Sequence, residues 1–159
     1  MGETSLDDYD RKLLAIVQED ASLSAEDLGQ RLHLSASATW RRLRRLKTQG
    51  FIAGEVALLD PERLALGVTA YVLITLKVQA PDALEDFLAK LKRSPEVVEI
   101  ANISGEADLM VKVRTADLAS YDRLLDDLVL RATQVATVRT CLVLKNHKSS
   151  TAMPLRFAP

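Results

Sequence analysis

Residues 28–50, LGQRLHLSASATWRRLRRLKTQG, carry the strongest structural signal in the chain. Leu28 and Leu32 form the apolar side of one short helix, and a two-residue connection leads to Ser35, which favours the N-cap of a second helix. Gly50 then marks the point where that second helix ends. Two helices joined by so tight a connection are typical of a helix-turn-helix unit.

A further helix is predicted before this stretch, in residues 6–20, LDDYDRKLLAIVQED, where apolar residues recur at helical spacing and acids occupy the first turn. Ser24 followed by Asp27 has the pattern of a capping box at the start of the middle helix. Residues 1–52 are therefore predicted to form a domain of three helices. In the third helix Trp40 falls towards the leucines, so we expect it in the small core rather than stacked on a base.

The charge of the chain is strongly segregated, although its 21 basic and 22 acidic residues give a net charge of only -1. Residues 1–27 contain eight acids and two bases, whereas residues 28–54 contain six bases and no acid. A positive stretch of this kind attracts phosphate backbones. A solvated helix face is the simpler alternative for a run of bases.

The polar side of the third helix points to duplex DNA as a partner. Recognition helices enter the major groove near their N-terminal ends, where small polar side chains suit base edges and flanking arginines reach phosphates. The predicted DNA-binding residues are Ser35, Ser37, Thr39, Arg41, Arg42 and Arg45.

The rest of the chain predicts a linker and a second domain. Residues 53–66 are expected to contain a strand or extended segment and a short helix, and residues 67–159 to form the second domain. Its expected elements are strands at 68–78, 97–103, 109–113 and 135–145 and helices at 80–93 and 117–130. This order, βαββαβ, predicts a ferredoxin-like domain with an antiparallel sheet and an α+β fold for the whole chain.

The residue types needed for catalysis or metal binding are hard to assemble. His33 and His147 are the only histidines and have no nearby ligand partners, and the single cysteine, Cys141, is expected to be a buried apolar residue of the last strand. A phosphate-binding glycine loop and a membrane-length apolar run are both missing from the sequence. We therefore expect no enzyme, no metal, no cofactor, no membrane contact and a cytoplasmic location.

The turn Ser104-Gly105-Glu106-Ala107-Asp108 is a candidate ligand site. Glycine permits backbone conformations that expose amide groups, and these amides could receive a carboxylate. The neighbouring carboxylates of Glu106 and Asp108 could receive an ammonium group. The turn is thus complementary to a free amino acid, although a polar β-turn joining two strands explains it equally well.

The stretches LDDYDRKLLAIVQEDASLS, LGQRLHLSASATWRRLRRLKTQGFI, VALLDPERLALG, SGEAD and LVLKNHKSSTAMPL resemble the Lrp/AsnC, or feast/famine, family of transcriptional regulators. The resemblance implies an N-terminal helix-turn-helix and a βαββαβ domain that dimerises through its sheet. It also implies assembly of dimers, often to octamers, on nucleoid DNA, with an amino-acid effector bound between dimers. The DNA contacts would fall on the six residues named above. The effector-binding positions would be Ser104, Gly105, Glu106, Asp108 and Thr140.

Two places depart from the family pattern near the expected effector site. Ala107 and Leu109 occupy positions where many members carry an aromatic residue, and Thr133-Gln134 stands where a Pro-Gly turn is common. The leading hypothesis is a sequence-specific regulator that responds to a small effector. The alternatives are an architectural protein that bridges or wraps DNA with little specificity, and an enzyme or metabolite-binding subunit built on the second domain.

Overall fold

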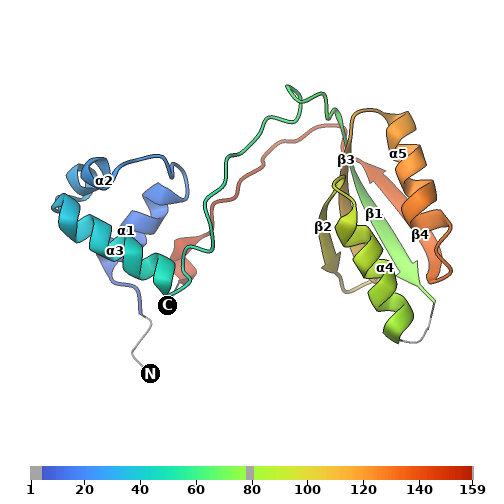
Figure 1. Ribbon diagram of the computed structural model, residues 1–159, viewed down its shortest axis with the longest axis horizontal. Coiled ribbons are helices and arrows are strands. Elements are labelled where there is room, and N and C mark those ends of the chain that lie inside the picture. The colour runs from blue at the N-terminus through green and yellow to red at the C-terminus, as the bar shows by residue number, and fades with distance from the viewer. Residues whose placement is uncertain (1–4, 78–80, 159) are drawn as a thin grey trace. The chain divides into compact units, whose positions relative to one another are not determined.

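The computed structural model describes residues 5–77 and 81–158 and divides into two compact units. The first unit extends to Leu58 and includes the C-terminal residues from Lys148 onward, and the second runs from Leu59 to His147 (Figure 1). Within the described residues, none of the helices has both the length and the apolar character needed to cross a membrane.

The first unit contains the three predicted helices, α1 (Asp8–Val17), α2 (Ala25–Leu32) and α3 (Ala36–Thr48). Ser24 and Asp27 form the predicted capping box of α2, and the Ser35 side chain caps α3 by accepting a hydrogen bond from the amide of Ala38. The first helix also begins with a capping box, in which Asp7 and Asp10 each accept a hydrogen bond from the other's amide. Side-chain caps thus fix where all three helices start.

The connection between α2 and α3 depends on a close backbone approach at Gly29. His33 ends α2 in the left-handed conformation, with φ of 55°, and the amide of Leu34 donates a hydrogen bond to the Gly29 carbonyl. A Cβ atom on Gly29 would lie only 2.6 Å from the carbonyl oxygen of Leu34. The core beneath this connection consists of Leu6, Leu13, Leu14, Val17, Leu28, Leu32 and Leu46.

Residues 53–66 differ from the prediction, because residues 53–60 form no strand and the expected short helix is only a turn at 61–65. The Asp60 side chain accepts hydrogen bonds from the amides of Glu62 and Arg63 and so shapes this turn. A strand requires a neighbouring strand to pair its backbone, and within the described residues segment 53–60 has none.

The C-terminal tail also lies elsewhere than expected, since residues from Lys148 onward belong to the helical unit and not to the second domain. Gln18, at the end of α1, accepts a hydrogen bond from the amide of Met153 at 2.8 Å and donates one to its carbonyl at 3.3 Å. Leu155 and Ala158 pack against the helical core. The tail therefore adds apolar cover to a domain whose own core is small.

The second unit has the predicted βαββαβ order. Its elements are β1 (Val68–Leu76), α4 (Pro81–Arg93), β2 (Val97–Asn102), β3 (Leu109–Thr115), α5 (Leu118–Leu125) with the π-helical turn η1 (Asp126–Leu130), and β4 (Val135–Leu142). The strands lie in the order β2-β3-β1-β4 and all neighbours are antiparallel. This is the topology of a ferredoxin-like fold, which confirms the predicted fold class. Residue 78, the expected end of the first strand, and residue 80, the expected start of the fourth helix, lie outside the described residues.

Helices α4 and α5 cover one face of the sheet, as Figure 1 shows. Val72 and Ile74 of β1 pack on this face with Phe87 and Leu91 of α4. Alternate residues point to the opposite face, which none of the described residues of the second unit covers.

The prediction that Cys141 is buried is wrong, because its side chain is exposed. It pairs with Tyr71 across β1 and β4, whereas its neighbour Thr140 pairs with the buried Val72. Alternation along the strand therefore places Cys141 on the open face of an edge strand.

Candidate nucleic-acid interface and ligand turn

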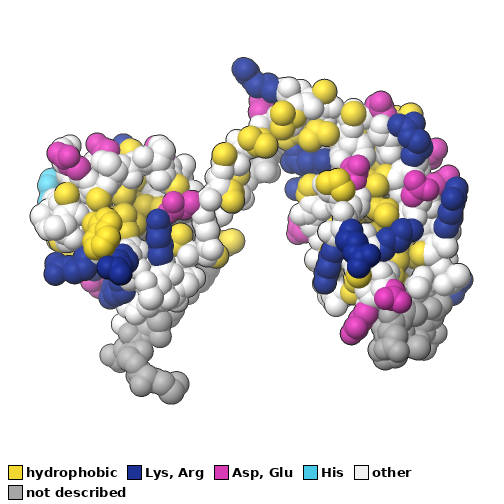
Figure 2. All heavy atoms as spheres, viewed as in Figure 1, with side chains coloured by type: hydrophobic (Ala, Val, Ile, Leu, Met, Phe, Trp, Pro, Cys, Tyr) yellow, Lys and Arg dark blue, Asp and Glu magenta, His cyan; other side chains and the backbone are white. Residues whose placement is uncertain are grey.

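The solvent-facing side of α3 is polar and positive. Ser37, Arg41 and Arg44 are exposed, and within residues 5–77 and 81–158 the Arg41 side chain forms no ion pair. At the start of the helix the hydroxyl oxygens of Ser35 and Ser37 lie 3.2 Å apart. Figure 2 shows Lys and Arg side chains gathered on one side of the helical unit. This arrangement presents hydroxyl groups at the helix N-terminus and cations along the following turns.

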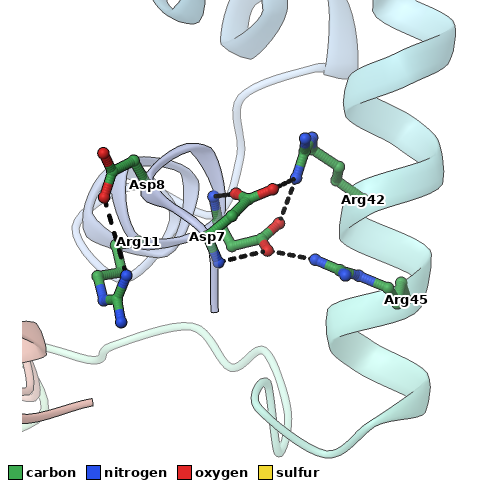
Figure 3. A network of polar contacts seen from close by, with 6 residues as sticks. Asp7, Asp8, Arg11, Arg42 and Arg45 are labelled. Atoms are coloured by element: carbon green, nitrogen blue, oxygen red, sulfur yellow. Dashed lines mark hydrogen bonds and ion pairs between the residues drawn. The ribbon is translucent and has the colours of Figure 1, made fainter. Parts of the chain in front are cut away.

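Two other arginines of α3 pair with acids at the start of the first helix, its N-cap Asp7 and Asp10 (Figure 3). Arg42 Nη1 donates hydrogen bonds to Asp7 Oδ2 at 2.6 Å and to Asp10 Oδ1 at 2.8 Å, and Arg45 Nη2 donates to Asp10 Oδ2. The Asp10 side chain is fully buried, whereas both arginines are partly exposed. Arg42 and Arg45 thus hold α3 against α1.

The pKa values of Arg42 and Asp7 shift in the direction that favours the charged form of each side chain. The hydrogen bond to Asp7 raises the pKa of Arg42, and that increase exceeds the opposing effect of burial. Burial alone would raise the pKa of Asp7, but hydrogen bonds from the Asp10 amide and from Arg42 outweigh it and lower that pKa. Both groups remain ionised at neutral pH.

Sequence reasoning missed Asp10 as a buried member of the first helix. A signal was present, because Asp10 lies three residues before Leu13 and seven before Val17, on the stripe that faces the core. A buried carboxylate at such a position requires a cationic partner, and the basic third helix was the obvious source.

Thr39 does not face solvent as predicted. Its side chain is completely buried, and its hydroxyl donates a hydrogen bond to the Ser35 carbonyl at 3.1 Å. Seven residues turn an α-helix by about 700°, so Thr39 lies only about 20° from the buried Leu46 around the helix axis. Thr39 is therefore a core residue and cannot contact DNA in this arrangement.

Trp40 shows the reverse error, since the prediction that it belongs to the core is wrong. Its side chain is 55% exposed, and the Arg44 guanidinium lies over its ring, 5.4 Å from the centroid. Six residues separate Trp40 from Leu46, which places the two about 120° apart around the helix. Trp40 thus stands at the edge of the polar face.

The candidate ligand turn between β2 and β3 has the backbone conformation expected of its glycine. Gly105 has φ of +131°, which side chains strongly disfavour. Asp108 Oδ2 accepts a hydrogen bond from the amide of Leu76 at 2.7 Å, and the Glu106 carbonyl accepts one from Thr75 Oγ1. These contacts tie the turn to the end of β1.

The structure brings Arg139 to the turn instead of Thr140. Arg139 Nη1 lies 3.3 Å from Glu106 Oε2, and both side chains are largely exposed. Thr140 Oγ1 lies 2.5 Å from the hydroxyl of Tyr121, on the helix-covered face. Adjacent residues of a strand point to opposite faces, so Thr140 and the turn do not meet within one chain. The signal for Arg139 was its position as the only charged residue in 135–144.

Tyr121 is itself a buried residue of the core between the sheet and its helices. Burial raises the pKa of its hydroxyl, and the hydrogen bond with Thr140 offsets only part of that increase. The hydroxyl is therefore neutral and able to donate or accept a hydrogen bond at neutral pH.

Two family models match the chain and together cover most of it. The AsnC-type helix-turn-helix domain matches residues 6–47, which hold α1, α2 and all but the last residue of α3. The Lrp/AsnC ligand binding domain matches residues 69–153. The chain belongs to the Lrp/AsnC family. The resemblance noted from the sequence is thereby confirmed, and the chain is a transcriptional regulator with a DNA-binding and a ligand-binding domain.

Two regulatory proteins are similar to this chain over most of its length. The glutamate uptake regulatory protein of Zymomonas mobilis is 38% identical over 150 residues, which cover 94% of this chain and 91% of that protein. The leucine-responsive regulatory protein of Salmonella typhimurium is 36% identical over 151 residues, covering 95% and 92% of the two chains.

Solved structures of transcriptional regulators have the same fold as this chain. A transcriptional regulator from Neisseria meningitidis, solved in complex with L-Met, has a TM-score of 0.91 and 33% identity and covers 95% of this chain and 97% of its own. An AsnC family regulator from Agrobacterium tumefaciens has a TM-score of 0.90 and 32% identity, with coverage of 96% and 99%.

Proposed function

We propose that this Lrp/AsnC regulator binds specific duplex DNA sites through the exposed side of α3. The observation that carries the proposal is the positive, acid-free surface of α3, on which Arg41 has no ion-pair partner among the described residues. Ser35 and Ser37 lie at the N-terminal end of the helix, where they suit base edges or phosphates. Arg41 and Arg44 supply phosphate contacts.

Arg42 and Arg45 have a different task in this proposal. Their hydrogen bonds to Asp7 and to the buried Asp10 fix the orientation of α3 relative to α1. Because a recognition helix must enter the groove at one orientation, these residues position the helix, and any phosphate contact that they make is secondary.

The effector of this chain, in the same proposal, is an amino acid bound at the turn of residues 104–108. The carboxylates of Glu106 and Asp108 attract its ammonium group, and Arg139, beside Glu106, attracts its carboxylate. Ser104 and Gly105 supply backbone amides, and Thr140 contributes from a neighbouring copy. The L-Met complex of the Neisseria meningitidis regulator and the name of the leucine-responsive relative support this class of ligand.

The proposal also includes self-assembly of the chain. The open face of the sheet packs against a second copy to form a dimer, and dimers associate further, to an octamer, in the cytoplasm on nucleoid DNA. The protein acts by binding and not by catalysis. The open face of β1, β3 and β4 supports the dimer, because a sheet face left uncovered in one chain gains stability when buried by another.

The proposed DNA binding is tested with fluorescently labelled duplexes that the full-length chain has selected from a random pool. The expected result is tight binding that falls steeply with salt and that unrelated duplexes do not compete away. Equal competition by unrelated duplexes would favour the architectural alternative, and a lack of binding would reject the proposal.

Thermal unfolding across the twenty amino acids tests the effector arm, because a ligand that binds only the native state raises its stability. At least one amino acid is expected to raise the midpoint for wild type and to do so much less for Glu106→Gln and Arg139→Ala. Leu118→Ala, an exposed position on α5, serves as the control. If no amino acid stabilises the wild type, the effector proposal is rejected while DNA binding stands.

A further inference from the structure

The tryptophan of α3 is a large apolar surface in an otherwise polar and positive setting. Trp40 is the sole tryptophan of the sequence, and 55% of its side chain is exposed. It lies one turn after Ser37 and one turn before Arg44, both of which are exposed. Leaving an indole ring in water forgoes the gain from burial, so its place on this face calls for a partner that covers it.

The charged residues around Trp40 indicate which class of partner covers its ring. The Arg44 guanidinium is held over the ring at 5.4 Å from its centroid, and residues 28–54 contain six bases and no acid. The described acids of the helical unit that pair with α3 do so away from Trp40: Asp7 and Asp10 pair with Arg42 and Arg45, and Glu55 pairs with Lys47. A second copy of this basic face would bring like charges together, whereas a polyanion such as duplex DNA complements it.

In the major groove of duplex DNA the characteristic apolar group is the C5-methyl of thymine. We propose that Trp40 is a specificity-determining residue that packs against a thymine methyl group, while Arg44, held on its ring, reaches the adjacent phosphate. This inference rests on the proposed DNA-binding function and deepens it. It assigns recognition of the thymine methyl group to the side chain of Trp40. The serine hydroxyls and the guanidinium groups of α3 are polar and do not supply this apolar contact.

The tryptophan emission of the chain, excited selectively over tyrosine, reports on this residue alone because Trp40 is the only tryptophan. Full-length protein is titrated with a labelled duplex selected from a random pool, and the anisotropy of the label is followed together with the tryptophan emission and its quenching by acrylamide. The expected result is that emission changes and acrylamide access falls along the same curve as the anisotropy. If the anisotropy rises while the emission and the quenching stay constant, the Trp40 contact is refuted and DNA binding stands.

Two other outcomes of this titration are also decisive. If the label shows no binding to any duplex, the proposed function fails and this inference fails with it. If acrylamide access falls with protein concentration in the absence of DNA, a second copy of the chain covers the ring and the DNA contact is overturned.

Replacing thymine by deoxyuridine, which lacks only the methyl group, identifies the atom that Trp40 contacts. At one thymine of the selected duplex, deoxyuridine is expected to weaken binding by wild type by about tenfold, the effect of one apolar base contact. For Trp40→Ala the same replacement is expected to have no effect, because the partner of the methyl group is gone. Leu130→Ala, an equally exposed apolar position of the second unit, is expected to behave as wild type.

The inference is overturned if every thymine can be replaced by deoxyuridine without loss of wild-type affinity. It is also overturned if the replacement lowers the affinity of Trp40→Ala as much as that of wild type at each position. Trp40→Phe keeps an aromatic ring and is expected to retain part of the discrimination. Circular dichroism of each variant shows that its helices remain folded, so a loss of binding cannot be assigned to unfolding.

Discussion

Arg42 of α3 donates a hydrogen bond to Asp10 of α1 at 2.8 Å, and the carboxylate that accepts it is fully buried. A second arginine, Arg45, donates to the other oxygen of the same carboxylate. Removing water from a carboxylate costs several kcal/mol, and the two guanidinium groups offset that cost. The position of the recognition helix is therefore coupled to the pairing of one buried acid in the first helix.

Arg42→Ala is expected to destabilise the helical unit by about 2–3 kcal/mol, because it leaves a buried carboxylate with one cationic partner in place of two. Hydrogen exchange of the α1 and α3 amides measures this loss within the unit. Arg41→Ala is the matched control and should change stability by less than about 0.5 kcal/mol, since its side chain is exposed. In Asp10→Ala/Arg42→Ala the two losses should not add, because the residues interact directly. Equal hydrogen-exchange protection of α1 and α3 in Arg41→Ala and Arg42→Ala would contradict a stabilising role for the Arg42–Asp10 pair.

The helical unit is expected to lose stability in acid as Asp7 takes up a proton. The pKa of Asp7 in the folded chain lies below its ordinary value of 3.8, because the hydrogen bonds from Asp10 and Arg42 outweigh the effect of burial. Such a group stabilises the fold fully above the unfolded pKa, and the contribution disappears as the pH falls through the folded pKa. Asp7→Asn keeps a side chain that caps helices well but cannot titrate.

The measurement is the thermal midpoint of wild type and Asp7→Asn at a series of pH values from neutral to below 3.8. The two proteins should diverge at neutral pH and converge in acid, because only the wild type loses a charged partner of Arg42 on acidification. Parallel curves over the whole range would show that Asp7 contributes no pH dependence.

Periodicity was enough to predict all three helices, the βαββαβ order and the ferredoxin-like fold, because apolar side chains recur on the faces that the core covers. The caps at Ser24 and Ser35 were equally predictable, since their signals are local. Thr39 and Trp40 were exchanged because residue type alone favours the wrong answer at both positions. Around the helix axis Thr39 lies about 20° from the buried Leu46, whereas Trp40 lies about 120° from it.

Contacts between distant segments could not be predicted in the same way. The burial of Asp10 depends on arginines 32 and 35 residues later, and the tail reaches Gln18 from 135 residues away. Such pairings leave no periodic trace in the sequence. The link between Arg139 and Glu106 has the same character, because it arises only when β4 pairs with β1.

Gly29→Ala is expected to destabilise the helix-turn-helix by about 1–3 kcal/mol. The added Cβ would lie 2.6 Å from the Leu34 carbonyl oxygen, a backbone atom that moves only if the turn between α2 and α3 moves. Gly54→Ala is the matched control, because nothing lies within 4 Å of the added atom and its φ is not positive. Thermal unfolding and DNA binding of both variants should separate them, and a Gly29→Ala protein as stable as Gly54→Ala would refute this close approach.

Arg41→Ala is expected to weaken DNA binding while leaving the fold intact, since this exposed side chain is free to neutralise a phosphate. Each phosphate contact contributes about 0.9 to the slope of log affinity against log salt, so the slope should become shallower by roughly one per helix-turn-helix unit. Arg63→Ala, which removes an exposed arginine of the second unit, should leave the slope unchanged. Arg42→Ala shows whether Arg42 contacts a phosphate or only holds α3 in position. If Arg42 only positions α3, its loss lowers affinity through instability of the unit and leaves the slope close to that of wild type, whereas a slope reduced as much as in Arg41→Ala would make Arg42 a phosphate contact.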